Sequence, residues 1–505
     1  MDRRTFLRNS AIVAASAFLP DLAHADAADP WSEGYAAALK RNPYLLGFRS
    51  VAPDAMFDAE VSFEGRLPEG LQGVLYRNGP ALHEMAGLRY HHWFDGDGLV
   101  HSFRIGGGKL VHKARLVLTD KLKTEIASGK RRRDAFGTTI PGADPTTSPD
   151  VINVANTSII PHAGEVLALW EGGSAYGVDP QSLATLGPKV WREDLKGLPF
   201  SAHPKVDASG TLWNFGLSTR DSALALYRID AAGAVKDAKL LSVPDMTMVH
   251  DFVVTSKHLV FLLPPIRYSH DKLAAGASFN ESHSWVKGAP MRALTVEKAD
   301  LQTHRLYDLP PGFVFHFGNA WEDAAGVIRF DYVRADDATN LFHEFRELMR
   351  GEVGARPATL TTHVTLDPAK GRATQVTTPG GVEFPRIDPR YVGERNTYLF
   401  SAAQLSPRGP RPLGFDGVRR LDMETGKLDA FRYGDDVMVE EHLFVPNAQA
   451  SAEGDGWLLG ASLDVRAGVT KLSVFNAAHL ADGPVATARL PYALPLGLHG
   501  NFRSA

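Results

Sequence analysis

A strand-rich unit that recurs about every fifty residues most constrains the fold of this 505-residue chain. Each copy has a turn with glycine or a charged residue, a strongly apolar strand, and a second strand that often ends in Asp and a polar turn. Seven such units predict an all-β fold, a seven-bladed β-propeller whose blades stand radially around an axis. A pair of long β-sandwiches is the alternative that this pattern leaves open. The copies begin at GVLYRNGP, GEVLALWEGG, GTLWNFGL, KHLVFLLPP, GVIRFDYV, NTYLFSAA and GWLLGASLD.

One segment departs from the strand pattern. In DDATNLFHEFRELMRG, residues 336–351, the apolar residues Leu341, Phe342, Phe345, Leu348 and Met349 recur at helical spacing. The spacing predicts a helix within an insertion that caps one face of the propeller.

Composition excludes several function classes. Acidic and basic residues are interspersed and sum to a net charge of -4, so the sequence carries no electrostatic footprint for nucleic acid. The chain has no cysteine, which excludes disulfides, thiolate metal sites, cysteine nucleophiles and iron–sulfur clusters.

The N-terminus resembles a twin-arginine signal peptide. The segment RRTFLR leads into a short apolar run, residues 11–19, which is too short to span a bilayer, and then into AHA, which has the form of a cleavage site. We expect a signal peptide over residues 1–25, an N-terminal arm over 26–60 and the propeller over 61–505. This signal predicts a periplasmic protein that is exported in the folded state.

Four of the nineteen histidines lie in apolar or glycine-rich contexts at one place in the repeat: His203, His250, His316 and His499. The innermost strands of a propeller converge on its axis, so four blades can each bring one side chain to a common point. A buried imidazole with one hydrogen bond is the alternative for each histidine alone. Four neutral imidazoles leave positions open in an octahedral shell, which suits Fe(II) that binds dioxygen beside a substrate better than structural zinc.

The sequence as a whole resembles the carotenoid cleavage oxygenase family, which also includes stilbene-cleaving oxygenases and a retinoid isomerase. The matching segments span almost the whole mature chain: GVLYRNGP, HHWFDGDGLVHSFRI, NVANTSIIPHAGEVLALWEGG, FSAHPK, MVHDF, FHFGNAWED, VEFPRIDPRY, EEHLFVP and LHGNF. The resemblance implies a seven-bladed propeller with a helical cap and one non-haem Fe²⁺ per chain. The four histidines above match the family's iron ligands.

The resemblance also implies a second set of residues around the iron. Glu171 would support His250, Glu383 would support His316, and Glu441 would support His499; carboxylates that accept the distal imidazole N–H fix the tautomer and offset the metal's charge. Thr157 in ANTSII matches a position beside the open coordination site, and an ordinary strand threonine is the alternative.

Aromatic residues near the FDGDG segment, residues 94–98, are candidates for a substrate tunnel. The Asp-Gly pairs of this segment predict a structural hairpin turn. Its neighbours Tyr90, Trp93 and Phe94 could line the tunnel.

The implied reaction is oxidative cleavage of a conjugated carbon–carbon double bond by O2 into two carbonyl products. A carotenoid or apocarotenoid needs a long apolar tunnel. A lignin-derived stilbene needs a shorter pocket with polar groups for its phenol, and Lys121 and Lys123 in TDKLKTE are candidate phenolate partners. We favour the carotenoid or apocarotenoid, because that substrate class is broader in the family.

Two functions of other classes remain alternatives. A propeller hydrolase that uses Ca²⁺ would need oxygen ligands, which four imidazoles do not supply. A non-catalytic binding propeller would not need four axial histidines. The same fold and iron also serve isomerisation in one family member, so they do not fix the reaction. An apolar tunnel mouth would allow peripheral membrane contact, and the sequence does not define the oligomeric state.

Overall fold

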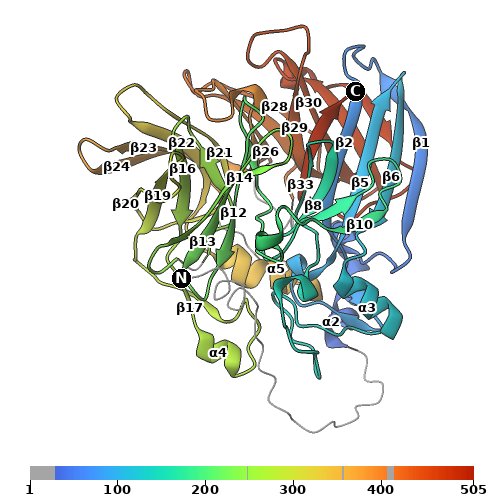
Figure 1. Cartoon of the computed structure of the whole chain (residues 1–505). Coiled ribbons are helices and arrows are strands. Elements are labelled where there is room, and N and C mark those ends of the chain that lie inside the picture. The colour runs from blue at the N-terminus through green and yellow to red at the C-terminus, as the bar shows by residue number, and fades with distance from the viewer. Residues whose placement is uncertain (1–28, 247, 355–357, 407–413) are drawn as a thin grey trace.

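The computed structural model describes residues 29–246, 248–354, 358–406 and 414–505. The expected signal peptide lies outside these residues. Antiparallel sheets fan out around a central region, and the short helices α2, α3, α4 and α5 gather toward the lower side of the view (Figure 1). The all-β propeller arrangement predicted from the repeat is confirmed.

Five sheets have four strands each, and in each of them the strands follow one another along the chain. The first two sheets consist of β7 (Ser158–His162), β8 (Glu165–Leu169), β9 (Tyr176–Val178), β10 (Thr185–Pro188), and of β11 (Lys205–Val206), β12 (Leu212–Ser218), β13 (Ala223–Ile229), β14 (Val235–Ser242). The next two consist of β15 (Phe252–Val254), β16 (His258–Leu263), β19 (Met291–Glu297), β20 (His304–Leu309), and of β21 (Phe313–Glu322), β22 (Ile328–Ala335), β23 (Leu360–Asp367), β24 (Arg372–Thr378). The fifth consists of β25 (Gly381–Arg386), β26 (Tyr398–Gln404), β27 (Gly417–Asp422) and β28 (Leu428–Arg432).

A nine-stranded sheet joins the two ends of the chain. Its order is β29-β30-β31-β32-β1-β6-β5-β2-β33, so the last strand lies beside β2 at one edge. The C-terminal strands are β29 (Val437–Pro446), β30 (Gly456–Asp464), β31 (Val469–Asn476), β32 (Pro484–Arg489) and β33 (His499–Ser504). The N-terminal strands are β1 (Met56–Gly65), β2 (Gly73–Leu82), β5 (Asp97–Gly106) and β6 (Lys109–Leu116).

The number of separate blades differs from the prediction. All seven expected repeat starts are strands, namely β2, β8, β12, β16, β22, β26 and β30. Five of these lie in separate four-stranded sheets, but β2 and β30 share the nine-stranded sheet. The reason is β1, which pairs with β6 along one edge and with β32 along the other. The prediction of seven separate blades is therefore wrong, and five are observed. The boundary placed at residue 60 falls inside β1.

The helical prediction over residues 336–351 holds for a shorter and irregular segment. A π turn η5 (Asn340–Glu344), α5 (Phe345–Glu347) and a 3-10 turn η6 (Leu348–Arg350) follow one another. Among the described residues, the other α-helices are α2 (Pro30–Leu39), α3 (Asp120–Ser128) and α4 (His270–Ala274). The other short turns there are η1 (Pro43–Phe48), η2 (Trp93–Asp95), η3 (Pro149–Ile152), η4 (Glu193–Leu195), η7 (Pro389–Tyr391) and η8 (Leu480–Asp482). Two small hairpins, β3 (Glu84–Met85) with β4 (Leu88–Arg89) and β17 (Ile266–Tyr268) with β18 (His283–Trp285), complete the fold.

The core is divided into apolar clusters between neighbouring sheets. In one cluster, Phe215 and Leu226 of the second four-stranded sheet pack against Phe252, Phe261 and Leu294 of the third. The apolar side chains pack between neighbouring sheets. The ends of the inner strands are not needed for this packing, so they can carry polar side chains at the centre. Within the described residues, no helix is both long and apolar enough to span a bilayer.

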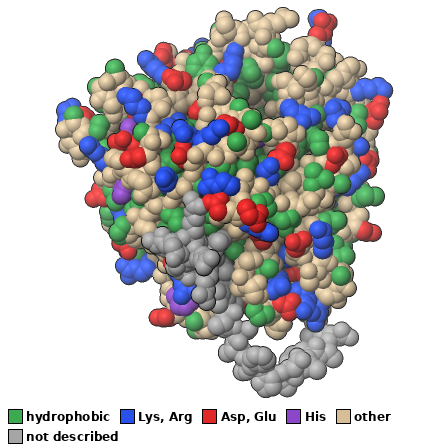
Figure 2. Space-filling model, viewed as in Figure 1, with side chains coloured by type: hydrophobic (Ala, Val, Ile, Leu, Met, Phe, Trp, Pro, Cys, Tyr) green, Lys and Arg blue, Asp and Glu red, His purple; other side chains and the backbone are tan. Residues whose placement is uncertain are grey.

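Positively and negatively charged side chains are mixed over the surface. Lys, Arg, Asp and Glu are interspersed over the face seen in Figure 2. This distribution agrees with the 54 basic and 58 acidic residues of the sequence.

Candidate metal centre and substrate cavity

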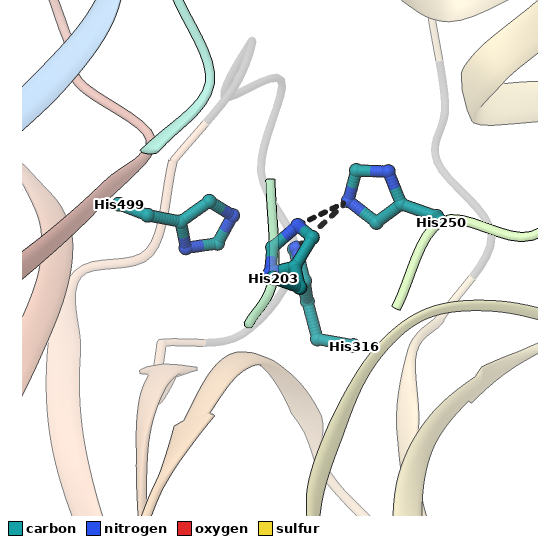
Figure 3. Close-up of side chains that lie close together, drawn as sticks. All are labelled: His203, His250, His316 and His499. Carbon is teal, nitrogen blue, oxygen red and sulfur yellow. Dashed lines mark hydrogen bonds between the residues drawn. The ribbon is translucent and has the colours of Figure 1, made fainter. Parts of the chain in front are cut away.

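The four predicted histidines meet at the centre of the molecule. One ring nitrogen from each of His203, His250, His316 and His499 lies within 4.8 Å of the other three. The Nε2 atom of His250 is 3.1 Å from Nε2 of His203 and 3.2 Å from Nε2 of His316. Figure 3 shows the four rings directed toward a common point. None of the four residues is more than 9% exposed.

Different elements supply the four rings. His203 and His250 lie in the loops just before β11 and β15, whereas His316 lies on β21 and His499 is the first residue of β33. These are the first strands of three four-stranded sheets and an edge strand of the nine-stranded sheet. The expectation that one residue per repeat reaches a shared point is therefore met by the geometry.

A glutamate contacts the outer nitrogen of three of these rings. Nδ1 of His316 is 2.5 Å from Oε2 of Glu383, and Nδ1 of His499 is 2.8 Å from Oε1 of Glu441. Nδ1 of His250 contacts a carboxylate oxygen of Glu171. The pairs are those that the family resemblance implies. Each carboxylate accepts the Nδ1 proton, which leaves the lone pair of Nε2 directed inward.

Burial and neighbouring charges set the protonation of this cluster. Burial lowers the pKa of His203 well below its usual value, and the other three imidazoles lower it further. Burial also lowers the pKa of His499 to about 4, against the opposing effect of Glu441. For His250, burial lowers the pKa, but the carboxylates of Glu171, Asp251 and Glu383 together outweigh it and the pKa is raised. The rings of His203 and His499 are thus neutral at neutral pH and can donate lone pairs to a metal.

The donor set fits a first-row transition metal. Four buried nitrogen donors converge, no sulfur is available in the chain, and three carboxylates offset positive charge from the outer shell. A calcium site would need oxygen atoms at the point of convergence. The residues that could hold the metal are His203, His250, His316 and His499.

The last strand is held at the centre by close backbone packing. His499 pairs with Asn78 in the antiparallel register of β33 and β2, and the Leu498 N–H donates to the Asn78 carbonyl at 2.9 Å. A Cβ atom on Gly500 would lie 2.3 Å from the Tyr76 carbonyl oxygen. Glycine at this position therefore allows β33 to approach β2.

An aromatic cavity of about 540 Å³ surrounds three of the histidines, His250, His316 and His499. Thr157 lines it and is 6% exposed, and its hydroxyl donates to Oδ1 of Asn156 at 3.0 Å. The aromatic part of the lining consists of Phe48, Trp93, Phe94, Phe136, Trp170, Phe215, Tyr268, Phe279, Phe313, Phe315, Phe342, Phe345, Phe384 and Phe415.

The residues around FDGDG only partly follow the prediction. Trp93 and Phe94 line the cavity, whereas Tyr90 is fully buried with the Arg131 guanidinium 3.9 Å from its ring centre. The segment is no hairpin turn: it runs from η2 into β5, and a Cβ on Gly98 would lie 2.2 Å from the Ala155 carbonyl oxygen. Close packing against a neighbouring backbone, not turn geometry, explains this glycine.

Neither candidate phenolate partner reaches the cavity. Lys121 is 2% exposed, and its Nζ lies 2.7 Å from Asp97 and 2.9 Å from Glu125. Lys123 is on the outside of α3, 3.4 Å from Asp120. The helical periodicity of this segment could have indicated that the two lysines lie on different faces of a helix. The burial of Lys121 could not be predicted from the sequence, because one of its carboxylate partners comes from β5.

Sequence reasoning missed the arginines that support the histidine-bearing strands. Nη2 of Arg386 lies 2.7 Å from Oε1 of Glu441, and this arginine with His499 holds the pKa of Glu441 at about 2 against the effect of burial. Arg77 pairs with Glu440 at 2.6 Å. The sequence offered one signal for these ion pairs: the charged residues lie inside the family-like segments GVLYRNGP, VEFPRI and EEHLFVP.

The fold and the site together define a class of protein: a β-propeller whose centre holds a buried, all-histidine site suited to a transition metal. Comparison with known proteins places the chain more closely. Residues 48–504 match the RPE65 family, described as retinal pigment epithelial membrane protein. The chain therefore belongs to this family, which contains the carotenoid cleavage oxygenases.

Several relatives are similar over nearly their full length. Apocarotenoid-15,15'-oxygenase from Synechocystis is 29% identical, over 91% of this chain and 96% of that protein. Lignostilbene-alpha,beta-dioxygenase isozyme III from Sphingomonas paucimobilis is 31% identical, over 89% and 94%. The solved structure of cobalt-substituted Synechocystis apocarotenoid oxygenase has a TM-score of 0.83 and 27% identity, and covers 92% of this chain and 98% of that one.

Proposed function

We propose that this protein is an Fe(II)-dependent dioxygenase that cleaves a conjugated carbon–carbon double bond of a carotenoid or apocarotenoid with O2 to give two carbonyl products. One observation carries the proposal: four inward-facing imidazoles lie beside an aromatic cavity of about 540 Å³. The names of the Synechocystis apocarotenoid oxygenase and of the plant carotenoid 9,10(9',10')-cleavage dioxygenases support the substrate class.

Bound iron would supply the activation of O2 beside the alkene. The chain's own residues have three tasks. His203, His250, His316 and His499 hold the metal, and their glutamate partners fix the ring orientations. The aromatic lining holds a rigid conjugated substrate and excludes water. Thr157 lines the cavity as a small residue, and its hydroxyl is occupied by Asn156.

A stilbene substrate is the alternative, and the lignostilbene dioxygenase at 31% identity favours it. The predicted phenolate partners do not support it, because Lys121 is paired elsewhere and neither Lys121 nor Lys123 lines the cavity. A binding propeller without catalysis would not require three carboxylates behind the imidazoles.

Two incubations of iron-loaded protein under air separate these functions. One contains an apocarotenal and the other a hydroxystilbene, and the carbonyl products are identified by mass spectrometry. We expect about one iron per chain and faster consumption of the apocarotenal. Faster cleavage of the stilbene would establish the alternative, and a native protein without bound metal would refute the oxygenase function.

Three further features belong to this proposal. We propose that the nine-stranded sheet occupies two of seven positions around the axis, because it contains two groups of four strands, β33-β2-β5-β6 and β29–β32, joined by β1. The turns η5 and α5 would cap the cavity, since Leu341, Phe342 and Phe345 line it. Export to the periplasm would follow from the twin-arginine segment, and immunoblotting of cell fractions tests it.

A further inference from the structure

One part of the cavity differs from the rest in its chemistry. Among the described lining residues, Arg220 is the only arginine or lysine, and Arg220 and His270 are the lining residues that are exposed to solvent. These two side chains therefore lie where the cavity lining meets the surface, at the cavity mouth. Arg220 lies in the tight turn between β12 and β13, and His270 is the first residue of α4, at the lower left of Figure 1.

Tyr268 and His283 line the same cavity as Arg220. They are opposite each other in the β17–β18 hairpin, their ring centres are 5.2 Å apart, and both pack on the ring of Phe279. The positive charge of Arg220 acts on the Tyr268 phenol, although burial dominates and raises the pKa of that phenol. The phenol is therefore neutral at neutral pH and can donate a hydrogen bond from a fixed position.

The side chains of Arg220 and Tyr268 have no polar partner within the described part of the chain. Neither makes an ion pair or a hydrogen bond there, in contrast to the carboxylates that line the same cavity. Asp95 accepts from Gly137 and Thr138, and Glu440 pairs with Arg77. Glu171 and Glu383 contact histidines. The cavity mouth thus presents the N–H donors and positive charge of Arg220 and the O–H donor of Tyr268 without polar partners. Each described carboxylate of the lining, in contrast, has a hydrogen-bond or ion-pair partner.

We propose that Arg220 and Tyr268 bind a carboxylate at the end of the substrate, so that the preferred substrates are apocarotenoids with a carboxylic acid terminus. This inference rests on the proposed function. A guanidinium presents a planar pair of N–H donors that matches a carboxylate, and the phenol adds a third donor. The conjugated chain would occupy the aromatic interior, and the charged end would stay at the mouth, where water still solvates it.

The order of preference follows from the donors at the mouth. A carboxylate accepts hydrogen bonds and carries a charge opposite to that of Arg220. An aldehyde accepts hydrogen bonds but has no charge. A methyl ester lacks the charge of the acid and differs little from it in length. We expect kcat/KM to fall in this order. For an exposed arginine, loss of the charged contact should reduce kcat/KM for the acid by about fivefold to tenfold.

The test uses an apocarotenoic acid and its methyl ester with three proteins: wild type, Arg220→Met, and Arg267→Met as the matched control. Arg267 is exposed on the same hairpin as Tyr268 but does not line the cavity. Dissociation constants come from quenching of tryptophan fluorescence in metal-free protein, and kcat/KM comes from the iron-loaded enzyme. We expect Arg220→Met to weaken binding of the acid while binding of the ester and the behaviour of Arg267→Met stay unchanged.

Binding and turnover distinguish this inference from the proposed function. Equal affinity of wild type for acid and ester, or equal loss of both in Arg220→Met, overturns the carboxylate site even if both compounds are cleaved. Tight binding of the acid that depends on Arg220, without cleavage of the acid, the apocarotenal or the hydroxystilbene, supports the site and refutes the oxygenase function. Tyr268→Phe provides a second variant and should show a smaller loss that is again confined to the acid.

Discussion

The guanidinium of Arg77 and the carboxylate of Glu440 form a buried ion pair, with Nε 2.6 Å from Oε2, that holds the segment leading to His499. Glu440 Oε2 also accepts the Gly497 N–H at 3.1 Å, and Arg77 Nη2 donates to the Pro495 carbonyl at 2.6 Å. Both partners are no more than 5% exposed. The pair thus fixes the path of the backbone two residues before His499, a proposed metal ligand.

Breaking this pair should loosen metal binding as well as the fold. In Glu440→Gln, Arg77 keeps its charge without a counterion, which costs about 3 kcal/mol or more in a buried setting. We expect faster loss of metal to a chelator and an altered d–d spectrum in the cobalt-loaded variant. Glu125→Gln is the control, because it disrupts another buried ion pair, with Lys121, away from the histidines. Equal metal loss in both variants would show that general destabilisation is the cause.

Removal of residues 499–505 should abolish metal binding and destabilise the protein. This deletion removes His499 and all of β33, whose register pairs it with residues 73–78 of β2. His499→Ala separates the two effects, because the strand remains while one of the four nitrogen donors is lost. We expect low metal content by elemental analysis in both variants, and a large fall in Tm only in the deletion. Full metal occupancy in His499→Ala would remove this residue from the ligand set.

A methyl group at Gly497 should be strongly destabilising. A Cβ atom there would lie 2.0 Å from Nε of Arg77, so the ion pair with Glu440 would have to move. Overpacking of this kind costs roughly 1–3 kcal/mol. Chemical denaturation of Gly497→Ala measures the loss, and Gly106→Ala is the control, since a Cβ there meets nothing within 4 Å. A loss of stability of the same size in both variants would contradict the proposed clash.

Asp331 should make the stability of the protein fall as pH rises. Burial raises the pKa of this carboxyl from 3.8 to about 7, and its Oδ2 has no hydrogen-bond partner. Below about pH 4 the group is protonated in both states; between pH 4 and 7 only the unfolded state releases the proton, so unfolding becomes more favourable. Above pH 7 the penalty is constant and on the order of a few kcal/mol.

Asp331→Asn should remove much of this dependence. The difference in Tm between the variant and wild type should grow by several degrees from pH 5 to pH 8, as measured by differential scanning calorimetry. The exposed Asp308→Asn is the control and should leave the pH dependence unchanged. A constant difference between Asp331→Asn and wild type across this range would show that Asp331 is ionised in the folded state.

The repeat in the sequence determined the fold class and the candidate site. Each apolar start of the repeat became a strand, because alternation and turn residues act over a few neighbours in the chain. The four histidines could be selected because each interrupts an apolar segment at one place in that repeat. The pairing of Glu171, Glu383 and Glu441 with His250, His316 and His499 came from the family resemblance, and the contacts agree with it.

Only the tertiary structure decided how these parts combine. The union of two strand groups through β1 depends on edge pairing between residues more than 400 positions apart, Phe63 with Ala488, which leaves no local signal. The burial of Lys121 beside Asp97, the Arg77–Glu440 pair at the last strand, and the solvent-facing Arg220 at the cavity mouth are likewise contacts between distant segments. Local periodicity specifies which residues form strands, but charge partners and cavity openings arise only where separate strands meet.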